Sequence, residues 1–147
     1  MSPYIMYIVI ILCALSFGGH CGQTVIEAKT TKSFEDVVTD VEYAIIEYNF
    51  RITSRSHVGA AIRERGYPGF PSYQIIHFCN LTYAKEVLEI DPGFVKHIPC
   101  RITIREEEGN VIISSSLLPE NSDDPRLNVF SRNINTMLRG IVDFAVE

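Results

Sequence analysis

Apolar residues recur at helical spacing in two segments of the chain. The first stripe follows Ser33 and consists of Phe34, Val37, Val38, Val41, Ala44, Ile45 and Tyr48. Ser33 is the predicted N-cap of this helix, because its hydroxyl can accept a hydrogen bond from the first turn. The second stripe follows the predicted cap Asp124 and Pro125, and consists of Leu127, Phe130, Ile134, Met137, Leu138, Ile141 and Ala145. The spacing predicts two amphipathic helices that each turn one face toward a core.

Shorter segments alternate apolar and polar residues, which is typical of strands with one buried face. They are residues 23–31, 50–58, 73–78 and a hairpin over 100–116 with its turn at Gly109-Asn110. In the second segment we expect Ile52, Ser54, Ser56 and Val58 on one side. A short helix is predicted over 81–91, closed by Asp91-Pro92-Gly93, and the Gly- and Pro-rich segment 60–73 is predicted to be irregular for at least part of its length.

The resulting order, β-α-β-β-α-β-β-α, predicts an α+β sandwich with helices packed on a mixed or antiparallel sheet. The chain of 147 residues has room for one domain, which we place over residues 23–147. An N-terminal hydrophobic helix is expected to precede this domain.

The first residues have the composition of an export signal. Apolar residues run almost unbroken from Tyr4 to Phe17, and no charged side chain occurs before Glu27. A secretory signal needs about 7–15 apolar residues and a membrane-spanning helix roughly 20. Residues 1–20 are therefore predicted to be a signal peptide or an uncleaved anchor through residues 4–19. Both readings place the domain outside the cytoplasm, in the periplasm or on the outer face of the membrane.

Charge excludes one class of partner. The formal net charge is −5 and the sequence pI is about 5.4. Nucleic-acid binding requires a concentrated basic surface. We therefore expect no nucleic-acid partner, and the dispersed charges are typical of a soluble surface.

Export changes the interpretation of the cysteines, because disulfides persist in oxidising compartments. Cys21, Cys79 and Cys100 make an odd number, which predicts one pair and one remaining thiol. The simplest pair is Cys79 with Cys100, since one would end a strand and the other begin the next. Cys21 would then lie near the membrane, where it could bridge two protomers.

Two histidines accompany this pair and allow more than one interpretation of it. His77 precedes Cys79 by two residues, and His97 precedes Cys100 by three. Imidazole and thiolate together suit copper, zinc or haem iron, although the spacing matches no standard zinc motif. Buried free thiols are also compatible with the sequence, as is a redox-active dithiol, which would need a lowered thiol pKa.

A second group of residues could line a ligand pocket. It consists of His57, Arg63, Tyr67 and Tyr73, near further arginines and Phe70. The simpler interpretation is a solvated strand followed by a loop with aromatic anchors. The sequence contains no G-x-S-x-G, H-E-x-x-H or phosphate-binding glycine loop, so catalytic residues are not assigned and an enzyme is not the favoured class.

Residues Phe34 to Ser116 resemble a bacterial and archaeal family known as domain of unknown function 302 (DUF302). The resemblance is carried by a strand that ends in Cys79-Asn80, a helix that closes at Asp91-Pro92, and Pro99-Cys100 before a strand-turn-strand. The Cys-Asn and Pro-Cys pair is similar to that of an exported subset of the family. The resemblance implies a compact α+β fold, often homodimeric, and no established activity.

Two functional hypotheses follow. The first is an exported, membrane-tethered interaction or accessory domain without enzymatic activity, acting as a homodimer or as a subunit of an envelope complex. The second is a metal-binding, haem-binding or thiol redox protein that uses His77, Cys79, His97 and Cys100.

Overall fold

The structure is a computed structural model that describes residues 24–147. The elements are β1 (Val25–Thr30), α1 (Phe34–Glu47), β2 (Arg51–Ser56), α2 (Val58–Glu64), β3 (Tyr73–Cys79), α3 (Leu81–Ile90), the 3-10 helix η1 (Pro92–His97), β4 (Cys100–Glu107), β5 (Asn110–Ser116) and α4 (Pro125–Val146). The signal peptide or anchor expected over residues 1–20, and Cys21, lie outside the described residues. In residues 24–147, none of the helices is both long and apolar enough to cross a membrane.

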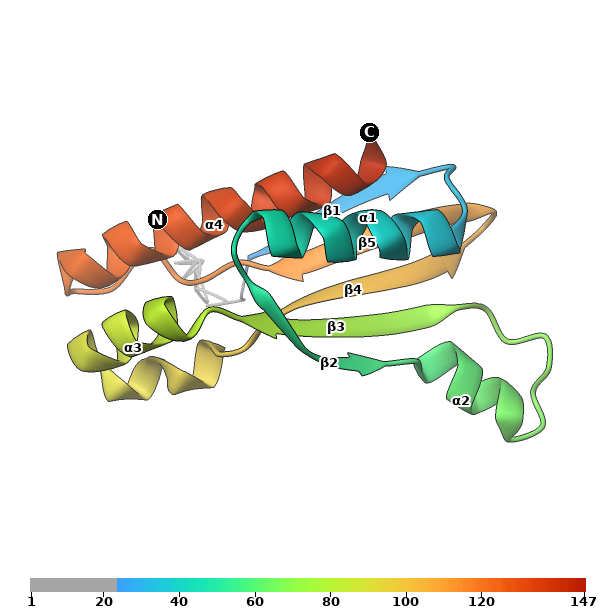
Figure 1. Ribbon diagram of the computed structural model, residues 1–147, viewed down its shortest axis with the longest axis horizontal. Coiled ribbons are helices and arrows are strands. Elements are labelled where there is room, and N and C mark those ends of the chain that lie inside the picture. Colours follow the sequence, from blue (N-terminus) through green and yellow to red (C-terminus); the bar gives the residue numbers. More distant parts are fainter. Residues whose placement is uncertain (1–23) are drawn as a thin grey trace, which may run out of the picture.

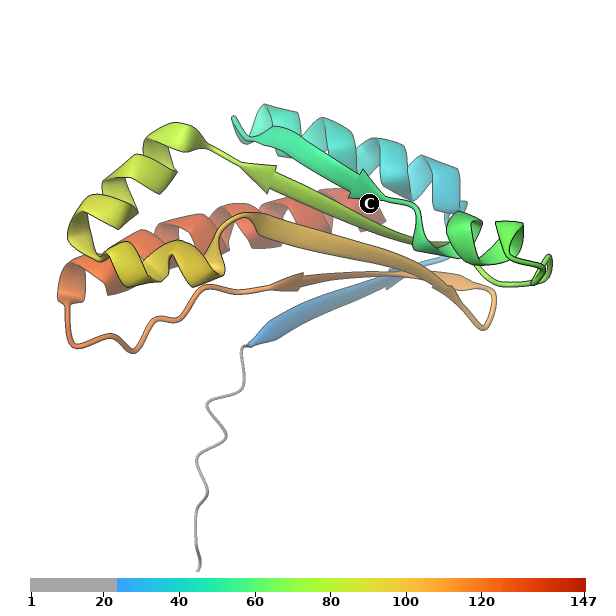
Figure 2. The same cartoon turned by 90° about the horizontal axis from the view of Figure 1, so that it is seen from below.

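The five strands form one sheet in the order β1-β5-β4-β3-β2. Every neighbouring pair is antiparallel, which confirms the α+β class and resolves the choice between a mixed and an antiparallel sheet. Helices α1 and α4 lie side by side on one face of this sheet (Figure 1). The view from below shows that none of the described helices covers the opposite face, and that α3 and η1 extend from one end (Figure 2).

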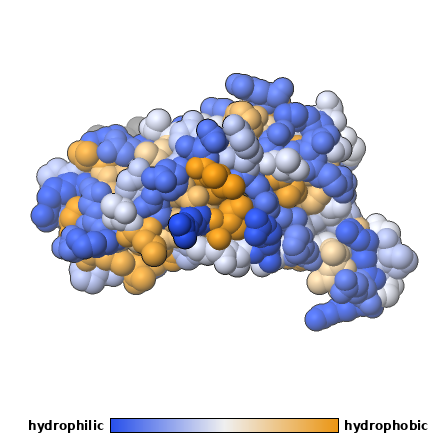
Figure 3. Space-filling view, in the orientation of Figure 1, coloured by the Kyte–Doolittle hydropathy of each residue, from blue (hydrophilic) through white to orange (hydrophobic). Residues whose placement is uncertain are grey.

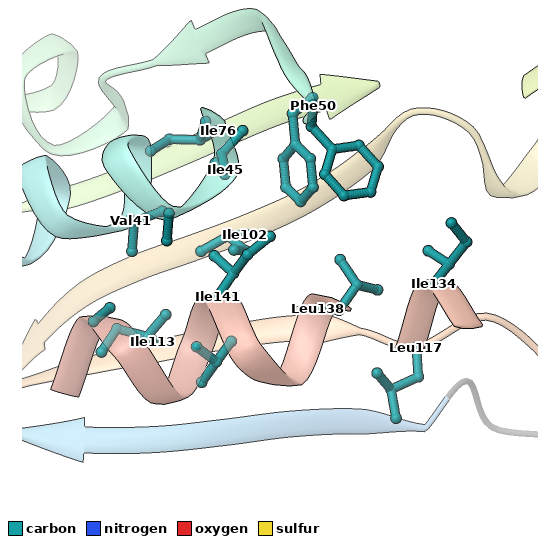
Figure 4. Packing of buried hydrophobic residues seen from close by; sticks show 14 of the residues in the cluster. Val41, Ile45, Phe50, Ile76, Ile102, Ile113, Leu117, Ile134, Leu138 and Ile141 are labelled. Carbon is teal, nitrogen blue, oxygen red and sulfur yellow. The ribbon is translucent and has the colours of Figure 1, made fainter. Parts of the chain in front are cut away.

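The core lies between the two long helices and the sheet (Figure 4). Val41 and Ile45 of α1 and Ile141 of α4 are completely buried against strand residues such as Ile76 and Ile102. Burying one such side chain stabilises the fold by about 1.5–3 kcal/mol. Both helices begin as predicted, because the Ser33 and Asp124 side chains each accept a hydrogen bond from their first turn.

Two helical segments differ from the expected element order. Helix α2 occupies part of the segment predicted to be irregular, and η1 links α3 to β4. Helix α2 is short and its N-cap His57 makes no side-chain capping bond. A helix of this length is stabilised by tertiary contacts rather than by its own sequence, so the pattern of residues did not reveal it.

A β-bulge in β2 overturns the expectation that Ile52 and Ser54 share one side. The pairing with β3 shifts between Ile52 and Ser54, so Ile52 lies opposite Phe78 and Ser54 lies opposite His77. An extra residue on one strand reverses the alternation of side chains beyond it. Ile52 therefore packs against the core, and Ser54 faces the uncovered side with His77.

The hairpin turn lies one residue earlier than predicted. Glu108 and Gly109 both have left-handed backbone angles, with φ of 51° and 76°. Two successive left-handed residues are the signature of a type I′ turn, which matches the twist of the flanking strands. Asn110 then begins β5 opposite Glu107.

Candidate functional site

The two predicted cysteines lie where β3 ends and β4 begins. These strands are antiparallel neighbours, and Phe78 is the direct partner of Cys100. Cys100 therefore shares the helix-covered face with Ile102 and Ile104, whereas Cys79 is the last residue of β3. Both thiols are free and partly buried. The strand pairing predicted from the sequence thus brings the two cysteines to the same corner of the sheet.

Asn80 fixes the chain immediately after Cys79. Its side-chain oxygen accepts hydrogen bonds from the backbone N–H groups of Thr82 at 2.9 Å and Tyr83 at 3.2 Å, and so caps α3. Its side-chain nitrogen donates to the Asn49 carbonyl oxygen at 2.7 Å. The Cys-Asn pair is therefore a strand-to-helix junction held at three points.

A small cavity of about 30 Å³ adjoins both thiols. Its lining is mostly aromatic and aliphatic, and consists of Phe50, Cys79, Asn80, Tyr83, Ala84, Phe94, His97, Ile98, Cys100, Leu118, Phe130 and Ile134. Phe50 packs edge-on against Tyr83, and Phe94 against Phe130, each with ring centroids 6.0 Å apart. A space of this size admits one water-sized group and leaves no room for a haem.

The apolar surroundings keep both thiols protonated. Burial raises the pKa of Cys79, with a smaller opposing effect from the Asn80 backbone N–H. Burial, reinforced by the nearby Cys79, raises the pKa of Cys100 to about 12. Nucleophilic cysteines need the opposite shift, because the thiolate is the reactive form. A catalytic dithiol requires a lowered thiol pKa, whereas the pKa is raised at both Cys79 and Cys100.

The two histidines have different environments. His97 lies in η1 with its ring 4.9 Å from that of Phe94, and burial followed by the charge of Lys96 lowers its pKa. His77 lies on the uncovered face of the sheet, where Nδ1 is 3.1 Å from the Ser54 hydroxyl. His97 lines the aromatic cavity, whereas His77 does not.

A second depression is lined by both histidines. It has a volume of about 240 Å³ and is lined by His77, Lys96, His97, Pro99, Cys100, Arg101, Ser116 and Leu118. His97 and Cys100 thus border both spaces, with Cys79 on one side and His77 on the other. Across residues 24–147, no group of three or more His, Cys, Asp or Glu side chains is arranged to hold a metal ion.

The other predicted pocket lies at the opposite end of the sheet. His57, Arg63 and Tyr73 line one groove there, whereas Tyr67 does not line it and is 65% exposed. Gln74 also lines this groove, although it was not among the residues predicted for the pocket. The alternation of side chains along β3 indicates that Gln74 is buried, because it lies on the same side of the strand as the buried residues Ile76 and Phe78.

Comparison with known proteins gives a family and a fold. A search of curated proteins found no match. The crystal structure of an uncharacterized conserved DUF302 protein from Bacillus stearothermophilus is similar, with a TM-score of 0.74 and 18% sequence identity. The likeness covers 86% of this chain and 100% of that chain, and at this identity it shows the fold. The family model named domain of unknown function DUF302 matches residues 26–143, and the chain therefore belongs to the DUF302 family.

Proposed function

We propose that this protein is an exported accessory domain of the cell envelope, which acts by binding another protein and whose Cys79–Cys100 pair forms a structural disulfide there. The observation that carries the proposal is the meeting of two protonated, partly buried thiols at the joined ends of β3 and β4. Such thiols are poor nucleophiles, so a structural role fits them better than a catalytic one.

Export is supported by the sequence before the domain. The uncharged apolar run from Tyr4 to Phe17 has the length of a secretory signal. In an oxidising compartment two neighbouring thiols pass two electrons and two protons to an incoming disulfide by exchange, and become linked themselves. The Cys-Asn and Pro-Cys pair would then mark the exported members of the family.

Binding of a partner is supported by an exposed apolar area on the two long helices. Tyr43 and Ile46 of α1 are 54% and 62% exposed, and Phe144 of α4 is 41% exposed. The Tyr43 and Phe144 rings stack with centroids 5.7 Å apart. Figure 3 shows apolar surface across the middle of this side of the molecule. We call Tyr43, Ile46 and Phe144 the helical patch. Contiguous exposed apolar residues are typical of interaction sites.

Two measurements test this proposal on the full chain from its native membrane. Non-reducing mass spectrometry is expected to show a Cys79–Cys100 linkage and either a cleaved N-terminus or a retained anchor in the membrane fraction. Cross-linking is expected to capture an assembly that Ile46→Lys weakens. Val129→Lys is the matched control, because Val129 is a 50% exposed apolar residue of α4 outside the helical patch. Free thiols together with a monomer unaffected by Ile46→Lys would overturn the proposal.

A soft-metal site is the second candidate function. It is favoured by one observation: Cys79, Cys100 and His97 all line a single cavity. Their side chains are not arranged around an ion in residues 24–147 as described, so binding would require them to turn toward it. The lowered pKa of His97 favours the neutral imidazole that metals bind. Cu(I) or Zn²⁺ would displace the thiol protons, and the small cavity suits an ion rather than a haem. Metal analysis of the reduced full chain, compared with Cys79→Ala, tests this role: loss of bound metal in the variant supports it.

A further inference from the structure

The groove at the far end of β3 has the features of a separate ligand site. It has a volume of about 380 Å³ and is lined by Phe34, Glu35, Val38, Thr39, His57, Ala60, Arg63, Ser72, Tyr73 and Gln74. Binding sites for small molecules have volumes of about 300–1,000 Å³. The first turns of α1, helix α2 and the start of β3 line this open groove, and Figures 1 and 2 show these parts at the end of the sheet opposite α3.

Gln74 supplies a buried donor without a partner. The residue is only 5% exposed, and its Nε2 makes no hydrogen bond with the residues that the structure describes. Leaving a buried polar group unpaired costs about 1–3 kcal/mol, so such a group calls for an explanation. Gln74 lines the groove, so a turn of its side chain would bring this enclosed amide nitrogen to an acceptor atom of a ligand there.

Arg63 supplies positive charge and further donors. Its Nη1 donates to the Phe70 carbonyl oxygen at 2.8 Å, which anchors the guanidinium at the groove. Its other N–H groups make no hydrogen bond within residues 24–147 and can take a carboxylate in a two-point contact. His57, the N-cap of α2, lines the same groove.

Three acidic residues affect the charge of the site differently. The Glu106 carboxylate accepts a hydrogen bond from the backbone N–H of the lining residue Ser72 at 2.7 Å. Glu42 lies near His57, but Arg55 engages both of its carboxylate oxygens at 2.6 and 2.8 Å. Glu35 is exposed at the rim of the groove and is not paired in this way. An anionic ligand is therefore favoured when its charge is inserted toward Arg63 and Gln74, away from Glu35.

The remaining wall is apolar and firmly positioned. Phe34, Val38 and Tyr73 offer hydrophobic surface beside the donors. Helix α2 packs closely on the chain before β3, since a Cβ on Gly59 would lie 2.5 Å from the Pro71 carbonyl oxygen. The backbone hydrogen bond from Glu106 N–H to Ser72 O, at 3.0 Å, holds the same segment from β4.

We propose that this groove binds a small organic monocarboxylate that carries an apolar or aromatic group. Its carboxylate contacts the Arg63 guanidinium and accepts from Gln74 Nε2, and its apolar part packs on Phe34, Val38 and Tyr73. This site is independent of Cys79 and Cys100 and does not rest on the function proposed above.

The test is calorimetric titration of the full chain with sodium benzoate, and with benzamide as an uncharged ligand of the same shape. Benzoate is expected to bind saturably and more tightly than benzamide. Arg63→Ala and Gln74→Met are expected to weaken benzoate binding about tenfold or more, because each removes a donor to a charged group. Arg65→Ala is the matched control, since Arg65 is an exposed residue at the end of α2 that does not line the groove.

Thermal melts check that the variants fold. Gln74→Met removes a buried group that lacks a partner, so its melting temperature is expected to equal or exceed that of the parent. Gln74→Leu provides a second replacement if the methionine does not fit. The proposal is overturned if benzoate shows no saturable binding at millimolar concentration. It is also overturned if benzamide binds equally well, or if folded Arg63→Ala and Gln74 variants bind benzoate as the parent does.

Discussion

Phe78 and Cys100 are cross-strand partners in β3 and β4, and this register decides the surroundings of both thiols. It places Cys100 on the face covered by helices, in line with Ile102 and Ile104, which are 0% and 1% exposed. Cys79 follows Phe78 and ends the strand beside the aromatic cavity. The two cysteines are thus neighbours in space, although α3 and η1 separate them along the chain.

Oxidation of this pair is expected to stabilise the domain. A Cys79–Cys100 disulfide would close a loop of about 20 residues, which corresponds to about 3 kcal/mol in the chain-entropy description. Urea unfolding of the oxidised protein should therefore show that much more stability than the double variant Cys79→Ala, Cys100→Ala. Adding reductant should lower the stability of the parent to that of the double variant. The stability of the double variant itself should not change. Equal midpoints for oxidised and reduced parent protein would contradict a structural bridge.

In the reduced protein, the thiols should react slowly at neutral pH. The pKa of Cys100 is raised from 9.0 to about 12, so its thiolate is scarce until strongly alkaline pH. Alkylation by iodoacetamide, followed by mass spectrometry, should be faster at Cys79 than at Cys100 and should rise with pH above 9. A rate that reaches its plateau below pH 8 at either cysteine would show a reactive thiolate instead.

The same shift affects stability. The folded state holds the Cys100 proton more tightly than the unfolded state, whose thiol titrates near 9.0. The stabilisation is complete below pH 9 and is lost as the pH rises from 9 toward 12. The reduced parent should therefore lose more stability over this interval than the Cys100→Ala variant, as measured by urea midpoints. Parallel losses in both proteins would show that other groups dominate.

Asn80 is expected to matter as a helix cap rather than as a ligand. Asn80→Ala removes the acceptor for two N–H groups of α3 and the bond to Asn49, and should destabilise the fold by about 1–2 kcal/mol. Asn80→Asp keeps the acceptor at the helix N-terminus and should cost less, since only the donor to Asn49 is lost. Chemical denaturation of both variants checks this order. Equal costs for the two variants would indicate that the contact with Asn49, which both of them lose, is the more important one.

Gly59 is expected to tolerate no side chain. A Cβ there would lie 2.5 Å from the Pro71 carbonyl oxygen and 2.7 Å from the Tyr73 nitrogen, both backbone atoms. Gly59→Ala should therefore destabilise the protein by about 1–3 kcal/mol, although alanine is the better helix former. Gly69→Ala is the control, because a Cβ at Gly69 meets nothing within 4 Å. Equal thermal stability of the two variants would show that α2 can move away from β3.

Gly140 and Tyr48 should be energetically coupled. A Cβ on Gly140 in α4 would overlap the hydroxyl of Tyr48, the C-cap residue of α1. Gly140→Ala should therefore gain little in the parent, whereas in the Tyr48→Ala background it should stabilise by about 1 kcal/mol through helix propensity. A double-mutant cycle measured by denaturation gives the coupling directly. Additive effects would mean that the ring turns aside without cost.

The spacing of apolar residues and the capping residues by themselves determined the parts of the fold that depend on local sequence. The stripe beginning at Phe34, the cap Ser33 and the cap-and-proline pair Asp124-Pro125 predicted the two long helices, because caps and 3.6-residue spacing are local properties. The resemblance carried by Cys79-Asn80 and Pro99-Cys100 gave the family, which the match over residues 26–143 confirms.

Only the tertiary structure decided features that depend on what one segment packs against. Helix α2 has no side-chain cap and is held by its contact with the chain at the start of β3. For this reason no local sequence pattern predicted it. The bulge that separates Ile52 from Ser54 is a property of the strand pair, because register is set by both strands. The same holds for the two candidate sites at the ends of β3. The sequence contained their residues, but the environment of Cys100 and the unpartnered Gln74 amide arise from neighbours distant in the chain, which bury these groups away from water.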